Sequence, residues 1–307
     1  MISLLLILKI AQLFAIMSIG YLITKLNVVK EEDSLVMSKI SIYVLLPAAI
    51  LNSFNTELSG TVKQGLIIAF IASISVHIIF YVIDVVYKKT VRASSVERAS
   101  IIYPNVANLI IPIVTYILGN EWVIYICAYL SVQIVFLWTH GIGMFDVEKK
   151  KILSKIIFNP CILSIAVGLL LMFCKIKLPR IVWEIPASLG NMLGPVSMLI
   201  AGMVLAQSDL KSLLGHKRAY FILLMRMIVC PVIVLLLFKF ASTLIVVENS
   251  KNILLITFLS SISPTAATIM QFSQIYDNDV ELAVSANIIT TISCIVTMPV
   301  LVFLYLL

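Results

Sequence analysis

The sequence predicts an all-α polytopic membrane protein that crosses the bilayer ten times. Of its 307 residues, 61% are hydrophobic and 12% are charged, whereas an average soluble domain has roughly 25% charged residues. Apolar runs recur along the whole chain, each close to the roughly 20 residues that a spanning helix needs. Two of these runs are interrupted by proline and polar residues. These observations together indicate a helical protein whose function lies within the membrane.

Apolar length and polar or Gly/Pro punctuation divide the chain into the ten predicted spans. The first span has no basic region ahead of it and contains Lys9, so we interpret it as a retained helix and not as a cleaved signal. The loops are too short for a separate soluble domain. The predicted spans cover residues 2–24, 34–54, 62–87, 97–118, 121–144, 156–175, 181–206, 218–242, 250–275 and 280–306.

The basic residues predict the orientation of these spans. Loops on one side hold thirteen Lys and Arg residues, and loops on the other side hold five. Cytoplasmic loops carry the excess of basic residues, so both termini are predicted to be extracytoplasmic. The net charge of +7 comes from basic residues that lie between apolar segments, where they set the topology. We therefore expect no nucleic-acid partner.

The first interrupted run lies in the fourth span and contains Tyr103, Pro104, Asn105 and, further on, Pro112. A proline lacks the backbone N–H and clashes with the carbonyl four residues earlier, so two carbonyls lose their helical partners. At membrane depth, such carbonyls are tolerated only inside protein or beside a polar cavity. The ninth span contains a similar run, 260–271, around Pro264. Broken helices at corresponding positions of two halves are typical of a transporter's substrate site.

The order of the prolines indicates an internal duplication. Pro47 and Pro195 lie in the second span of each half, and Pro104 and Pro264 lie in the fourth. Five spans per half would insert the two halves in opposite orientations. We therefore predict a first inverted repeat at residues 1–145, a cytoplasmic linker at 146–155 and a second repeat at 156–307.

Polar residues beside the breaks are the predicted substrate ligands. Beyond each break, a half-helix N-terminus exposes unpaired N–H groups and the positive end of a helix dipole, which favour a carboxylate. The alternative is that these side chains only join neighbouring helices, with about 0.6 kcal/mol per hydrogen bond. The predicted substrate-binding residues are Pro104, Asn105, Asn108, Pro264, Thr265, Thr268 and Gln271.

Ionisable residues within the spans have two interpretations each. Arg226 either extends to the cytoplasmic surface or guides an anion. His77 and His140 could bind protons, although a hydrogen-bonded core position is the favoured interpretation. The carboxyl group of Asp84 lies at the cytoplasmic end of the third span, and none lies at the predicted site. We therefore expect no sodium site built on a carboxylate and favour a uniporter, with proton coupling left open.

Other functional classes find little support in the sequence. The five cysteines occur singly within apolar runs, so neither a disulfide framework nor a metal site is predicted, and no cofactor is expected. The sequence contains no zinc-protease or nucleophile-elbow motif, so we expect no enzyme. A ligand-sensing receptor that binds at the break without transport remains the alternative to a carrier.

The chain resembles the auxin efflux carrier family, which includes plant auxin carriers and bacterial malonate or malate carriers. The similarity extends along essentially the whole chain. Its most specific part runs from Tyr103-Pro104-Asn105 through Ile111-Pro112 to Leu118-Gly119. Further matches are Leu46-Pro47, Asn159-Pro160, Gly202-Met203, and Ser263-Pro264 followed by Ile275-Tyr276-Asp277.

The resemblance implies an elevator fold like that of sodium/proton antiporters and bile-acid symporters. Helices 4 and 9 would cross at Pro104 and Pro264, and Asn105 would contact a substrate carboxylate. Helices 1, 2, 6 and 7 would form a dimerising scaffold, and helices 3–5 and 8–10 would move. The chain lacks the long central loop of the plant carriers and has Thr265 and Thr268 after the second proline, so auxin selectivity does not follow.

The sequence therefore predicts a secondary-active or facilitative carrier of a small organic anion that works by alternating access. The short loops and the resemblance place it in the plasma (inner) membrane as a homodimer. Malonate, malate, auxin-like aromatic acids and amino-acid derivatives all remain candidate substrates.

Overall fold

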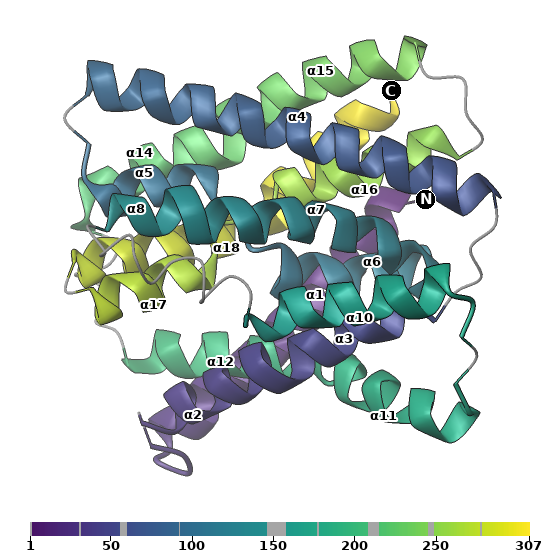
Figure 1. Ribbon diagram of the computed structural model, residues 1–307. Helices are drawn as coiled ribbons and strands as arrows, with labels where there is room; N and C mark the ends of the chain where they lie inside the picture. The colour runs from purple at the N-terminus through teal and green to yellow at the C-terminus, as the bar shows by residue number, and fades with distance from the viewer. Residues whose placement is uncertain are drawn as a thin grey trace.

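The computed structural model describes residues 2–30, 32–55, 60–91, 93–145, 158–176, 178–207, 215–244, 249–276 and 278–307. Within these residues the regular structure is helical, and no β-strand occurs. Figure 1 shows a bundle of long helices, and the N- and C-terminal ends of the chain lie at the same end of this bundle. The predicted linker 146–155 lies outside the described residues.

The helices are labelled α, and the labels η1, η2, η4 and η6 denote π-helical turns, whereas η3 is a 3₁₀ turn. The described first half contains α1 (Ile2–Lys25), α2 (Asp33–Ile40), η1 (Ser41–Leu45), α3 (Leu46–Ser53), α4 (Gly60–Thr90), α5 (Ser95–Ile102), η2 (Val106–Ile110), α6 (Ile111–Ile117), η3 (Asn120–Trp122), α7 (Val123–Phe136), η4 (Leu137–Gly141) and α8 (Ile142–Met144).

The described second half contains α10 (Pro160–Phe173), α11 (Arg180–Asn191), α12 (Leu193–Gln207), α14 (Lys217–Leu224), η6 (Met225–Val229), α15 (Cys230–Leu244), α16 (Ser250–Ser261), α17 (Ala267–Ile275) and α18 (Val280–Leu306).

Helical segments occupy each of the ten predicted ranges. Among the described residues, six helical runs are long and apolar enough to cross a membrane: Asp33–Ser53, Gly60–Thr90, Val123–Gly141, Arg180–Gln207, Lys217–Thr243 and Val280–Leu306. The ranges 97–118 and 250–275 are not among them, because their helices are interrupted as predicted. The complete arrangement of ten spans in two inverted repeats stays a prediction.

Three of the described π-helical turns end two residues before a proline. The turn η1 precedes Pro47, η2 precedes Pro112 and η6 precedes Pro231. A wider turn makes room for the proline ring and redistributes the backbone hydrogen bonds without ending the helix. The expectation that Pro112 breaks the fourth span is therefore wrong, because η2 and α6 form one run on both sides of it. Only Pro104 interrupts this span.

The helices pack in two groups. In one, α1 lies along α12, and α3 packs on α10 and α11; in the other, α4 packs on α7 and α16, and α18 packs on α14 and α17. The contact of α1 with α18 joins the two groups. The α1–α12 contact is close because Gly20 and Gly202 have no side chain. A Cβ atom at Gly202 would collide with the carbonyl oxygen of Met17, and one at Gly20 would collide with that of Leu199.

Candidate functional site

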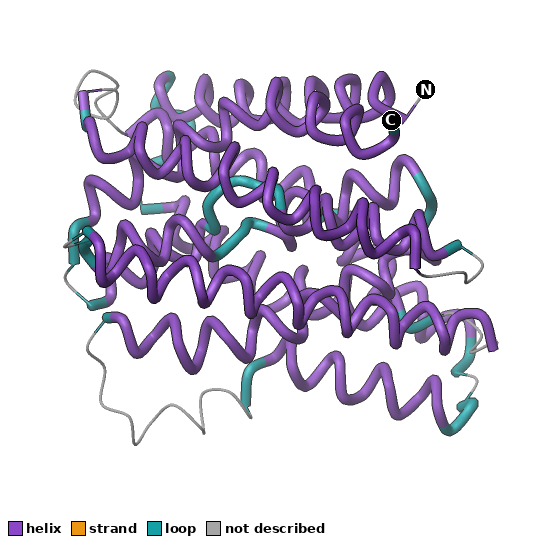
Figure 2. Tube along the Cα trace, turned by 90° about the horizontal axis from the view of Figure 1, so that it is seen from above, coloured by secondary structure: helices purple, strands orange, loops and turns teal. Residues whose placement is uncertain are grey.

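Two non-helical stretches, 103–105 and 262–266, meet in the interior of the protein. Figure 2 shows loop segments inside the bundle, between the ends of the interrupted helices. Pro104 and Thr265 form an antiparallel bridge. The Asn105 N–H donates to the Pro264 carbonyl at 2.7 Å, and the Ala266 N–H donates to the Tyr103 carbonyl at 2.9 Å. We call this paired region the crossover; it joins the two halves of the chain through their backbones.

The carbonyls that the two prolines release find partners within the protein. The Thr265 hydroxyl donates to the Ser100 carbonyl at 2.9 Å, which is the carbonyl four residues before Pro104. The Ser263 hydroxyl donates to the Ser260 carbonyl at 3.0 Å, four residues before Pro264. A buried carbonyl without a partner would cost roughly 1–3 kcal/mol, so these hydroxyls make the two breaks tolerable.

Arg226 lies behind the crossover and contacts the C-terminal ends of both interrupted helices. Its side chain is fully buried, at 0% exposure. The guanidinium donates to the Ser263 carbonyl at 2.9 Å, to the Ile101 carbonyl at 3.1 Å and to the Ser261 carbonyl, and it stacks over the Phe80 ring at 5.2 Å. The expectation that this arginine extends to the membrane surface is therefore wrong.

The position of Arg226 follows from electrostatics. Each helix C-terminus carries the equivalent of up to about half a negative elementary charge, and α5 and α16 both end here. One guanidinium thus offsets two helix ends and supplies donors to carbonyls that water cannot reach. In this conformation the guanidinium donates to backbone carbonyls from both halves of the chain.

A cavity of about 150 Å³, which we call the crossover cavity, opens beside the paired stretches. Of the predicted site residues, Pro104, Asn105 and Thr268 line it. Pro264 and Thr265 belong to the crossover but are not among the lining residues, since the Thr265 hydroxyl faces the Ser100 carbonyl. The side chains of Asn108 and Gln271 lie outside the described part of the chain. The cavity therefore brings together three of the seven predicted substrate residues.

Several polar residues of the cavity were not predicted from the sequence. Gln133 donates to the Pro104 carbonyl at 2.7 Å, and Asn287 donates to the Thr265 carbonyl at 2.8 Å. Each is the one amide side chain in its helix, α7 or α18, and this was the signal available in the sequence. The remaining polar lining residues are Ser38, Ser41, Ser197 and Thr291.

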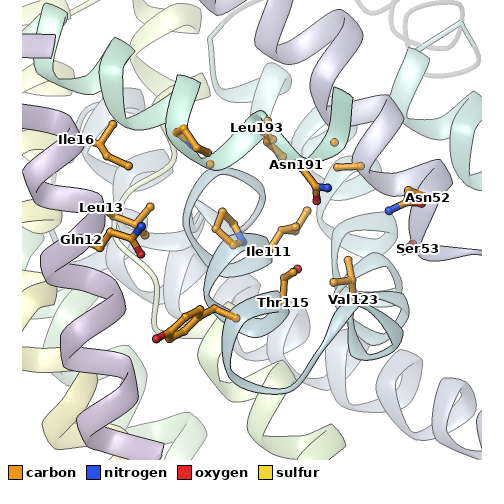
Figure 3. Close-up of a pocket in the computed structure, with 16 residues that line it drawn as sticks. Gln12, Leu13, Ile16, Asn52, Ser53, Ile111, Thr115, Val123, Asn191 and Leu193 are labelled. Carbon is orange, nitrogen blue, oxygen red and sulfur yellow. The ribbon is translucent and has the colours of Figure 1, made fainter. Parts of the chain in front are cut away.

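A second opening of about 420 Å³, the α1–α3–α6 cleft, lies between the two helix groups. Figure 3 shows the polar side chains of Gln12, Asn52, Thr115 and Asn191 projecting into it. At its floor, Pro112 packs so closely on Gly194 that a Cβ atom there would lie 2.6 Å from the proline ring.

The comparison with known families agrees with this architecture. The profile of a family described as membrane transport protein matches residues 5–302, nearly the whole chain. The chain belongs to the auxin efflux carrier family. A search of curated proteins finds no match. Membership in the auxin efflux carrier family, together with the apolar helices, identifies an integral membrane transporter for a small molecule.

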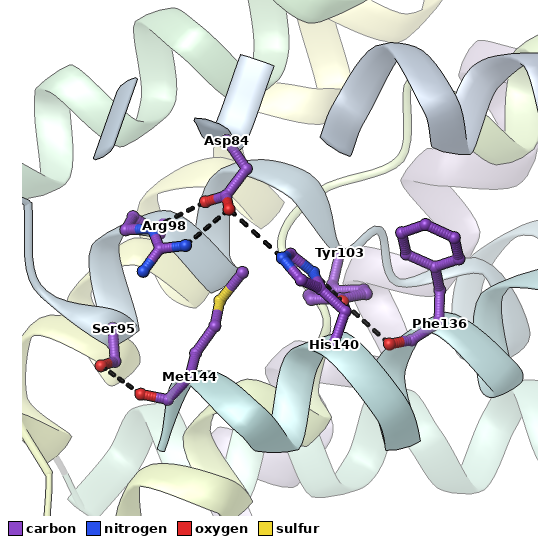
Figure 4. Close-up of polar contacts among 7 residues, drawn as sticks. All are labelled: Asp84, Ser95, Arg98, Tyr103, Phe136, His140 and Met144. Atoms are coloured by element: carbon purple, nitrogen blue, oxygen red, sulfur yellow. Dashed lines mark hydrogen bonds and ion pairs between the residues drawn. The ribbon is translucent and has the colours of Figure 1, made fainter. Parts of the chain in front are cut away.

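In this member of the auxin efflux carrier family, a charged network lies beside Tyr103 (Figure 4). The Asp84 carboxylate, whose side chain is 1% exposed, pairs through both oxygens with Arg98. His140 Nε2 lies 3.3 Å from the same carboxylate, and His140 Nδ1 lies 3.0 Å from the Tyr103 hydroxyl. The sequence placed Asp84 at the end of a span; the structure buries it within the bundle, beside the crossover.

Proposed function

We propose that this transporter carries a small organic anion with a carboxylate group. The observation that carries the proposal is the chemistry of the crossover cavity. The first residues of two helical runs line it, Val106 and Ala107 on one side and Ala267 and Thr268 on the other. Helix N-termini attract anions through free N–H groups and the helix dipole. None of the described residues that line the cavity is charged, so an anion would be held without a strong countercharge that prevents its release.

The size of the cavity favours a small substrate. A cavity of about 150 Å³ accommodates a molecule of about the size of benzene. A carboxylic acid of three or four carbons fits this space, whereas an acid with an indole ring would require the cavity to widen. We therefore propose short mono- or dicarboxylates in preference to auxin-like aromatic acids.

We further propose alternating access by an elevator motion. Two features support it: the larger helix contacts fall mainly in two groups, and residues from both groups line the crossover cavity and the α1–α3–α6 cleft. Sliding the group that carries the crossover past α1, α3 and α12 would open the site to each side in turn. The homodimer, the plasma-membrane location and the extracytoplasmic termini belong to the same proposal.

Thermal stabilisation tests the substrate class. Purified protein is heated with each member of a panel of short mono- and dicarboxylates, because a ligand at a hundredfold excess over its Kd stabilises the folded state by about 2.7 kcal/mol. We expect at least one acid to stabilise the wild type and Asn105→Ala to abolish the effect. Asn55→Ala is the matched control, since Asn55 is exposed after α3 and does not line the cavity.

Counterflow of the labelled acid in proteoliposomes then separates a carrier from a receptor. A carrier exchanges labelled for unlabelled acid across the bilayer, whereas a ligand-sensing receptor binds without exchange. Stabilisation without counterflow would establish the receptor. If no acid stabilises the protein, or Asn105→Ala responds like the wild type, the crossover cavity is not a carboxylate site.

A further inference from the structure

Asp84, His140, Tyr103 and the Phe136 carbonyl form a continuous series of hydrogen-bonding contacts beside the crossover. The Phe136 carbonyl only accepts hydrogen bonds, and the Tyr103 hydroxyl donates to it at 3.1 Å. The Asp84 carboxylate, kept ionised by its two contacts with Arg98, also only accepts. His140 lies between these two acceptors, with Nε2 towards Asp84 and Nδ1 towards the Tyr103 oxygen.

Only a doubly protonated His140 satisfies every one of these contacts. Nε2 must carry a proton to bind Asp84. The Tyr103 hydroxyl has one proton and lies within hydrogen-bond distance of both the Phe136 carbonyl and His140 Nδ1. If it donates to the Phe136 carbonyl, its oxygen must accept from a proton on Nδ1. In neutral His140 with the proton on Nε2, Tyr103 would have to give up the Phe136 carbonyl in order to donate to Nδ1. The protonation state of His140 therefore decides which hydrogen bond Tyr103 makes.

Tyr103 connects this choice to the crossover. It immediately precedes Pro104, and its own carbonyl accepts the Ala266 N–H at 2.9 Å. Gln133, two turns before His140 along the same helical run, holds the Pro104 carbonyl and lines the crossover cavity. A change at His140 is thus one residue removed from the backbone pairing that shapes the cavity.

The helix itself is unusual at this place. His140 lies in the π-helical turn η4, and η4 is the one described π-helical turn that no proline follows within two residues. Single π-helical turns without a proline frequently occur at functional sites. The His140 side chain is 20% exposed, whereas that of Asp84 is 1% exposed.

We propose that His140 is a proton-binding site and that the carboxylate crosses the membrane together with a proton bound there. With His140 protonated, Asp84, Arg98 and His140 sum to one positive charge, which offsets one negative charge of a carboxylate in the uncharged crossover cavity. The groups that face His140 among the described residues are Asp84 and Tyr81 of α4, Arg98 of α5, Tyr103, and Phe136 of its own helix.

The proton site is tested without any substrate. The chain has three histidines, so ¹⁵N-histidine NMR of the protein in nanodiscs resolves them after single substitutions. Across a pH series, we expect the wild-type His140 ring to have a state in which both nitrogens carry a proton and a state in which only one does. Tyr103→Phe removes the hydroxyl and is expected to shift this transition. A His140 ring that keeps one proton throughout, or that ignores Tyr103→Phe, overturns the site.

Proton movement is tested in proteoliposomes with a trapped pH indicator and radiolabelled malonate or malate; this part rests on the proposed function. We expect wild-type uptake to acidify the lumen and to be several-fold faster from an acidic external medium than from a neutral one. His140→Gln is expected to lose both effects. His77→Gln is the matched control. His77 is buried in α4, and its ring is hydrogen-bonded to the Ser73 carbonyl and not to Asp84 or Tyr103.

The outcomes distinguish the two proposals. Uptake without acidification, or acidification that survives in His140→Gln, overturns proton coupling and leaves the carboxylate carrier standing. If the wild type takes up neither acid, these substrates are wrong, and the NMR measurement still decides the proton site. Malonate and malate are protonated to the same degree in the wild-type and His140→Gln experiments. Protonation of the acids therefore does not account for a difference in acidification between the two proteins.

Discussion

At the scale of single residues, Arg226 shows how a membrane protein can keep broken helices in its interior. Proline breaks expose carbonyls where water is absent, and each such group needs a donor. Arginine suits this position because its rigid, planar guanidinium has five N–H donors. Here three backbone carbonyls, from both halves of the chain, accept from one side chain.

Replacing Arg226 should therefore destabilise the protein strongly. Arg226→Met leaves three buried carbonyls without donors, and at roughly 1–3 kcal/mol each we expect a loss of at least about 3 kcal/mol. Arg226→Lys should be intermediate, because an ammonium group cannot span all three carbonyls. The apparent melting temperature of the detergent-solubilised protein measures this. Lys239→Met, an exposed cation in the following helix α15, serves as control, and an unchanged Arg226→Met would contradict the capping role.

At the scale of elements, two kinds of proline site have different consequences. Pro47, Pro112 and Pro231 follow π-helical turns and leave their helices continuous. Pro104 and Pro264 lie in non-helical stretches that pair with each other across the two halves. At these two breaks the backbones of the two halves bond to each other, and the carbonyls that the prolines release accept from the Thr265 and Ser263 hydroxyls.

The α1–α12 contact provides a prediction at this scale. Gly202→Ala places a methyl group against the Met17 carbonyl and forces the two helices apart, which should cost about 1–3 kcal/mol. Gly143→Ala is the comparison, because no atom lies within 4 Å of its added methyl group. We expect a lowered melting temperature for Gly202→Ala alone. Equal melting temperatures for the two variants would show that α1 and α12 can separate without loss.

At the scale of the whole molecule, the arrangement of the chain in the bilayer can be tested with a native cysteine. Cys174, directly after α10, is exposed, and the other four cysteines are buried. The predicted orientation places Cys174 on the extracytoplasmic side. In intact cells, we expect a membrane-impermeant maleimide to label the wild-type protein and to leave the Cys174→Ser variant unlabelled. Labelling that requires permeabilised cells would reverse the predicted orientation.

Much of the helical layout was predictable because it depends on local composition. Apolar length located the helical ranges, and the missing N–H of Pro104 and Pro264 located the interruptions. The site was predicted less completely. Asn105 and Thr268 line the crossover cavity, but Thr265 supports the backbone. Gln133 and Asn287 come from α7 and α18, where no neighbouring proline marks a site.

The sequence by itself determined that this chain is a helical membrane protein of the auxin efflux carrier family with two broken helices, because hydrophobicity and proline geometry are properties of local segments. Only the tertiary structure decided what satisfies the breaks and what surrounds the cavity. Arg226 lies more than a hundred residues from Ile101, and His140 lies 56 positions from Asp84. Contacts between such distant segments depend on packing, and neither spacing nor composition encodes which partner a buried charge will meet.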